Sequence, residues 1–72
     1  MNQEIREKYN ELKQSLAEAR KIYFSAERDY IESAQKVGKT NVSYEIWKNF
    51  IAARDRVEII EKELRKIIDG AN

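Results

Sequence analysis

A single interruption divides a sequence that otherwise has the pattern of helix from end to end. Residues 37–43 read Val-Gly-Lys-Thr-Asn-Val-Ser, in a chain of 72 residues that has two glycines and no proline. Gly38 is expected to end the first helix in the left-handed conformation. Ser43 is the best N-cap for the second helix, and Asn41 is the alternative. We therefore predict one domain over residues 1–72, with a helix over about 3–37, a turn over 38–42 and a helix over about 43–69.

Apolar side chains recur in both predicted helices at alternating steps of four and three residues, which is the heptad pattern of a coiled coil. In the first helix, positions a hold Tyr9, Leu16, Tyr23 and Tyr30, and positions d hold Leu12, Ala19 and Ala26. In the second helix, positions a hold Phe50, Val57 and Leu64, and positions d hold Ile46, Ala53, Ile60 and Ile67. The fold class is therefore all-α, an antiparallel two-helix coiled-coil hairpin.

The turn also predicts the register of the hairpin. If the turn is centred on Gly38, the numbers of residues that face each other across the seam sum to 76. Every layer of the seam is then apolar, and Ala26 lies opposite Phe50 as a small residue against a large one. Two helices of this length bury little surface, so isolated hairpins are marginally stable. We expect two hairpins to pair into a four-helix bundle.

Apolar side chains also lie outside the seam, on one flank near the turn. In an antiparallel pair, the e and b positions of both helices share one flank, and the g and c positions share the other. Phe24 and Ile31 occupy b positions of the first helix, while Tyr44 and Ile51 at b and Trp47 at e come from the second. The register places Ile31 level with Tyr44 and Trp47, and Phe24 level with Ile51. We therefore predict that the five form one aromatic patch at the turn end that binds a partner.

Two features qualify this interpretation. Trp47 is also the residue expected to pack on Val42 as a hydrophobic staple at the start of the second helix, and this contact alone would explain its presence. The opposite flank holds fewer apolar residues, Ile22, Ala52 and Ile59, among polar and charged ones. That flank is the poorer binding surface, although it could still extend the core of a bundle.

The composition argues against several classes of function. The chain has no cysteine and no histidine, so it lacks the usual metal ligands and the commonest general base. We predict no enzyme activity, no metal site and no cofactor. Charges are balanced, with a net charge of +1, which argues against a dedicated nucleic-acid binder. No apolar run could cross a bilayer and the N-terminus lacks a signal-peptide pattern, so we expect no membrane partner and a cytoplasmic location.

The sequence favours a non-catalytic protein-interaction module, a small regulator or inhibitor that binds a larger protein through the aromatic patch. The partner could be another protein, a second copy of the chain, or both in turn. One alternative is a dimeric hairpin that binds RNA or DNA through its scattered cations. Another is a structural subunit of a larger assembly. The high content of Lys, Ile and Glu suits a bacterium or phage with an AT-rich genome.

Overall fold

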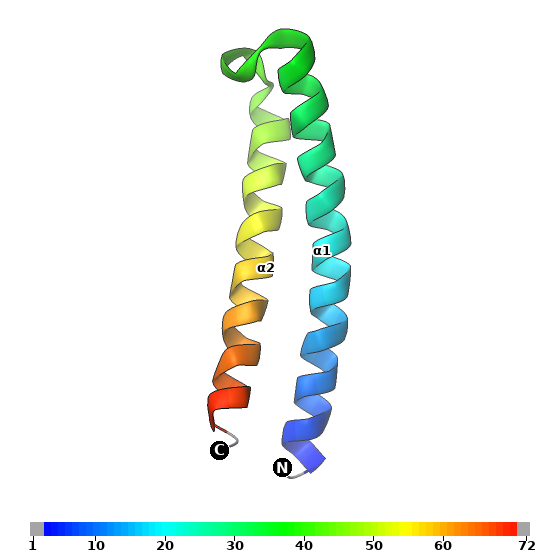
Figure 1. Ribbon diagram of the computed structural model, residues 1–72, viewed down its shortest axis with the longest axis vertical. Helices are drawn as coiled ribbons and strands as arrows, with labels where there is room; N and C mark the ends of the chain where they lie inside the picture. Colours follow the sequence, from blue (N-terminus) through cyan, green and yellow to red (C-terminus); the bar gives the residue numbers. More distant parts are fainter. Residues whose placement is uncertain (1–2, 71–72) are drawn as a thin grey trace.

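The chain forms a helical hairpin, as predicted. The computed structural model describes residues 3–70. It contains α1 (Gln3–Val37), the short 3-10 helix η1 (Lys39–Asn41) and α2 (Tyr44–Gly70) (Figure 1). α1 and α2 lie side by side and antiparallel, so the two ends of the chain lie at the same end of the hairpin (Figure 1). Two further expectations from the sequence, Asn2 as the N-cap of the first helix and residues 71–72 as a frayed tail after Gly70, concern residues outside the described range.

The turn closes with hydrogen bonds from both backbone and side chain. The Gly38 amide donates to the Ala34 carbonyl at 2.8 Å, and the Asn41 amide donates to the Gly38 carbonyl at 3.1 Å. The side-chain amide of Asn41 donates to the Val37 carbonyl at 2.9 Å. One of the carbonyls left unpaired at the end of α1 is thereby satisfied. Asn41 therefore caps the first helix and does not begin the second.

Gly38 has a backbone conformation that differs from the expected one. Its φ is 87° and its ψ is 154°, so the positive φ was predicted correctly but the left-handed helical ψ was not. This region of conformational space is essentially restricted to glycine. The extended ψ carries the chain away from the axis of α1 and into the 3-10 turn.

α2 begins as predicted and ends one residue later than expected. The Ser43 hydroxyl accepts a hydrogen bond from the Ile46 amide at 3.2 Å, which is the geometry of an N-cap bonding to the third helical residue. At the other end, Gly70 is the last residue of the helix, whereas the sequence suggested that the helix stops before it.

The seam follows the heptad pattern, but its burial is uneven along the hairpin. The buried hydrophobic residues are Leu16, Ala19, Ala53, Ile60 and Leu64. Four of them, all but Ala53, form the core cluster, against which Tyr9, Leu12 and Val57 pack. This cluster lies in the half of the hairpin that contains the chain ends. Nearer the turn, the seam residues are only half-buried, and Val37 is 48% exposed.

Candidate interaction surfaces

The five residues of the predicted aromatic patch lie at the surface in the half of the hairpin nearest the turn. Tyr44 is 70% exposed, Phe24 57%, Ile31 47% and Trp47 46%, and Ile51 is half-buried. Large apolar side chains gain about 1.5–3 kcal/mol each when they are fully buried. The exposure of four of them therefore leaves a considerable part of that free energy available for binding.

Ring contacts join some members of the patch to each other and some to the seam. The rings of Tyr44 and Trp47 lie 6.1 Å apart, inclined at 35°. They are neighbours because side chains three positions apart in the sequence lie on the same face of a helix. The ring of Phe24 lies 5.7 Å from that of Tyr23. The structure thus brings Tyr44 together with Trp47, and connects Phe24 to a seam residue of its own helix.

Behind the patch, three aromatic rings of the seam form a stack. The Phe50 ring of α2 lies 5.7 Å from the Tyr23 ring and 5.0 Å from the Tyr30 ring of α1, with interplanar angles of 16° and 17°. All three are a positions, which lie next to the e positions on a helix. The stack therefore fills the side of the seam that supports the patch.

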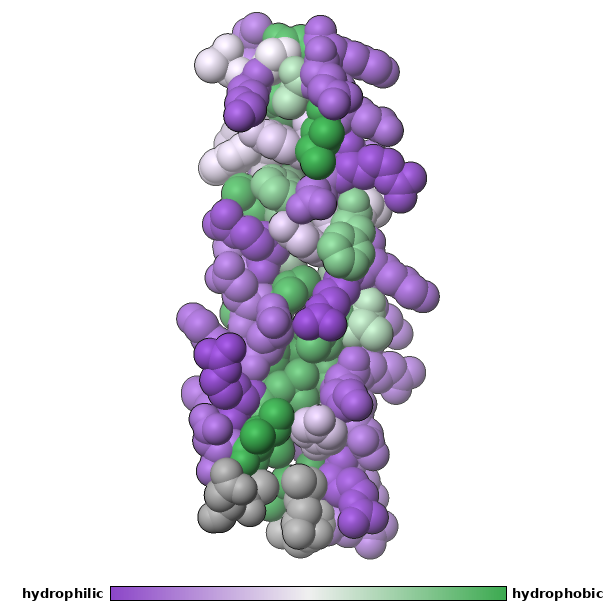
Figure 2. All heavy atoms as spheres, viewed as in Figure 1, coloured by the Kyte–Doolittle hydropathy of each residue, from purple (hydrophilic) through white to green (hydrophobic). Residues whose placement is uncertain are grey.

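Charged side chains continue the same flank toward the chain ends. Arg20 Nη2 of α1 lies 3.8 Å from Glu61 Oε2 of α2, with both side chains about half exposed. Within α2, Arg54 Nη2 lies 3.8 Å from Asp55 Oδ1. A hydrogen bond to Glu27 raises the pKa of the Tyr23 hydroxyl above its ordinary value of 10.0, and desolvation adds to the effect. The Arg20–Glu61 ion pair therefore lies on the side of the patch toward the chain ends. Figure 2 shows apolar side chains in green between hydrophilic ones in purple along the face in view.

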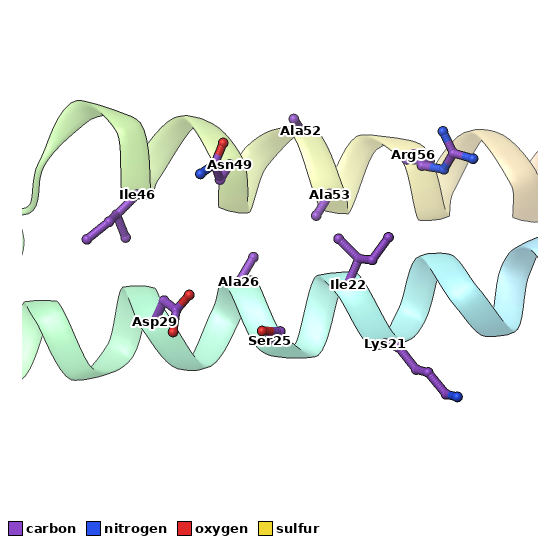
Figure 3. Close-up of a pocket in the computed structure, with 10 residues that line it drawn as sticks. All are labelled: Lys21, Ile22, Ser25, Ala26, Asp29, Ile46, Asn49, Ala52, Ala53 and Arg56. Atoms are coloured by element: carbon purple, nitrogen blue, oxygen red, sulfur yellow. The ribbon is translucent and has the colours of Figure 1, made fainter.

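The opposite flank, which the sequence suggested was the poorer binding surface, contains a groove. Its main section lies between α1 and α2 (Figure 3). There Ile22 and Ala26 of α1 point toward α2, and Ile46 and Ala53 of α2 point toward α1 (Figure 3). Polar and charged residues border it: Lys21, Ser25, Asp29, Asn49 and Arg56. Further sections extend it past Ile59 in one direction and toward Val37 in the other.

The groove has a cause that the sequence could have revealed. The d positions lie on the g side of each helix, and several of them in the half near the turn are small: Ala26, Ser33 and Ala53. The bulky a residues Tyr23, Tyr30 and Phe50 occupy the other side of the seam. When the a and d positions are treated as a single apolar stripe, the difference in side-chain size between the a side and the d side of the seam is not apparent.

Two other kinds of site are absent from the described residues. Within residues 3–70, no cluster of three or more acidic, histidine or cysteine side chains is arranged to hold a metal ion. Neither α1 nor α2, over the ranges described, is long and apolar enough to cross a membrane. The surface features of this part of the chain are the aromatic patch and the groove.

Comparison with known proteins identifies no relative. No family model matches the chain, and no significant match is found among curated proteins or solved structures.

Proposed function

We propose that this chain is a non-catalytic protein-interaction module, a small regulator or inhibitor that binds a larger protein through the aromatic patch. The observation that carries the proposal is the exposure of Phe24, Ile31, Tyr44 and Trp47, between 46% and 70%, at one end of the hairpin. Exposed apolar surface of this kind is typical of an interaction site.

The side-chain hydrogen bonds that cap α2 and close the turn do not involve the patch residues. Ser43 caps α2 through its hydroxyl and Asn41 closes the turn through its amide. The core cluster lies toward the chain ends. A helix surface with no binding role could carry polar side chains at positions 24, 31, 44 and 47. The concentration of aromatic rings there is therefore better explained by a partner than by folding.

The chemistry of the patch indicates the kind of partner surface it would bind. Rings of Trp and Tyr provide large contact areas with little conformational freedom to lose, and they dominate many interfaces. The ion pair Arg20–Glu61 on the same flank would lie outside the apolar centre, where charges affect orientation more than affinity. The partner would present an apolar groove or pocket to the turn end of the hairpin. Masking of such a surface is the mode of action that we propose for a chain of this size.

The proposal also includes the pairing of hairpins into a four-helix bundle. A hairpin whose described part has only five buried hydrophobic residues has a small core, and pairing two hairpins is a common way to enlarge it. In such a bundle, the patch would remain available only if the pairing used the other flank.

The test compares two double variants in a binding assay with immobilised protein and cell extract. We expect Trp47→Ala with Ile51→Ala to lose the bound partner while keeping the far-UV circular dichroism of the wild type. The matched control is Ile22→Ala with Ile59→Ala on the opposite flank. It should still capture the partner even where the pairing of hairpins is weakened, because the patch is unchanged. Retention of the partner by the Trp47/Ile51 variant would refute the proposal.

The salt dependence of binding provides a second measurement. Binding through an apolar patch should change little between low and moderate salt. Binding to RNA or DNA should weaken by orders of magnitude over the same range, because counterions are released from the phosphates. A steep loss, together with nucleic acid in the bound fraction, would replace the proposed function with nucleic-acid binding.

A further inference from the structure

The groove on the g and c flank is apolar at its base and flanked by exposed isoleucines. Ala26, Ala53 and Ile46 line it. The two alanine side chains are too small to fill the space between the helices on this side. Ile22 and Ile59, at the g and c positions of the two helices, are each 58% exposed. The flank therefore has both recesses, at alanines and serines, and protruding side chains. A surface with both is suited to packing against itself.

We infer that a second copy of this chain occupies the groove, with the two hairpins antiparallel about a two-fold axis at their midpoint. The interface is the g and c flank of each copy, and the product is a four-helix bundle. This inference rests on the pairing of hairpins included in the proposed function, and it assigns the flank and the orientation of that pairing.

The area of the flank fits a stable homodimer. A compact monomer of 8.6 kDa exposes about 4,700 Å², whereas the hairpin exposes 5893 Å². The excess of about 1,200 Å² reflects the elongated shape of the hairpin, which leaves more side-chain surface available to a partner. The hairpin measures 52 × 16 × 15 Å, so one long face covers about 830 Å², and a standard interface buries about 800 Å² per partner. One flank of a second copy is thus large enough.

The antiparallel arrangement sets the protruding Ile59 opposite a recess. Full overlap about the midpoint of α1 (Gln3–Val37) pairs its residues so that their numbers sum to about 40. Through the register of the seam, residues of α2 then pair to a sum of about 112. Ile59 lies opposite Ala52 of the second copy, and Ser15 lies opposite Ser25 of the second copy. A large side chain faces a small one, as close packing requires.

Charge complementarity selects this orientation. The same sums place unlike charges together at both ends of the bundle, each pair occurring twice: Glu4 with Lys36, Lys8 with Glu32, and Glu45 with Lys66. Three contacts oppose it: Glu11 faces Asp29, Arg56 faces its own copy near the axis, and Glu18 faces the apolar Ile22. In the parallel arrangement α1 would face α2 of the second copy at sums of about 76, so that Glu32 would meet Glu45 and only Glu11 would meet an unlike charge, Lys66. Exposed pairs contribute little to affinity, but they discriminate between orientations.

The arrangement leaves both aromatic patches free. Each patch lies on the e and b flank, which faces away from the interface in each hairpin. The dimer would carry one patch near each end, because the two turns point in opposite directions. A dimeric module of this kind binds two copies of its partner, or two sites of one partner, with increased avidity.

Sedimentation equilibrium of the purified chain tests the inference. The wild type should be a dimer, and Ile59→Asp should weaken dimerisation about 100-fold, since it places a charge opposite Ala52 in the apolar part of the interface. Ile22→Asp should weaken it as well, because it sets a second negative charge opposite Glu18 of the other copy. The matched control is Ile31→Asp on the patch flank, where the side chain is 47% exposed; it should stay dimeric. Far-UV circular dichroism of the dissociated variants checks that each remains helical. A monomeric wild type, or a dimer disrupted only by Ile31→Asp, would overturn the inference.

A charge exchange tests the orientation. Lys8→Glu and Glu32→Lys should each weaken the dimer at low salt, and the double variant should restore it because the pair is re-formed between copies. Failure of the double variant to recover would exclude the antiparallel arrangement. These results are separable from the proposed function: loss of partner binding by Trp47→Ala with Ile51→Ala in an intact dimer concerns the patch alone.

Discussion

The ring of Phe50 in α2 stacks on the ring of Tyr30 in α1, with centroids 5.0 Å apart and planes inclined at 17°. The same Phe50 ring lies 5.7 Å from Tyr23, one heptad earlier in α1. Phe50 is therefore level with the midpoint between Tyr23 and Tyr30, which is the position of Ala26. This is the pairing that the turn at Gly38 predicts, so the register of the hairpin is confirmed.

The stack predicts that two phenylalanines contribute very differently to stability. Phe50→Ala removes a half-buried ring from the seam and should lower the free energy of unfolding by about 2–3 kcal/mol. Phe24→Ala is the matched change on the surface, where the ring is 57% exposed, and it should cost less than about 1 kcal/mol. Urea unfolding followed by circular dichroism, at one protein concentration, measures both. Equal losses would show that Phe24 supports the fold and that the patch is partly structural.

The backbone conformations of the two glycines predict different effects of alanine substitution on stability. Gly38 has a φ of 87°, which L-residues rarely adopt, so Gly38→Ala should destabilise the hairpin by about 1–3 kcal/mol. A Cβ at Gly70 would meet nothing within 4 Å. Since Gly70 belongs to α2, Gly70→Ala should leave stability unchanged or raise it by up to about 1 kcal/mol. Thermal unfolding of both variants checks this, and a neutral Gly38→Ala would mean that the turn relaxes to another conformation.

The hydrogen bond between Tyr23 and Glu27 predicts a loss of stability at alkaline pH. It raises the pKa of Tyr23 above 10.0, so the folded state favours the protonated phenol. The resulting stabilisation is fully present below pH 10 and is lost as the pH rises through the raised pKa. The difference in unfolding free energy between the wild type and Tyr23→Phe should therefore shrink above about pH 10. The other three tyrosines are present in both proteins and cancel. A difference that stays constant with pH would exclude this linkage.

Most of the fold follows from local patterns in the sequence. The heptads predicted two helices and their seam, Ser43 was identified as the N-cap from its position alone, and a glycine without proline marked the turn. Helical periodicity also identified which large apolar side chains fall outside the seam. The details that failed depend on a few dihedral angles: the ψ of Gly38 and the continuation of α2 through Gly70. The role of Asn41 depended on which helix its side chain reaches, and only the folded turn decided it.

The sequence by itself determined the helices, their register and the apolar character of both flanks, because these follow from the repeat of side chains along a helix. The tertiary structure decided how the two sides of the seam differ. Tyr23, Tyr30 and Phe50 stack on one side, while Ala26 and Ala53 leave the other side open as a groove. The reason is geometric: the a and d positions look equivalent in a linear pattern, but two packed helices direct them to opposite sides of their contact.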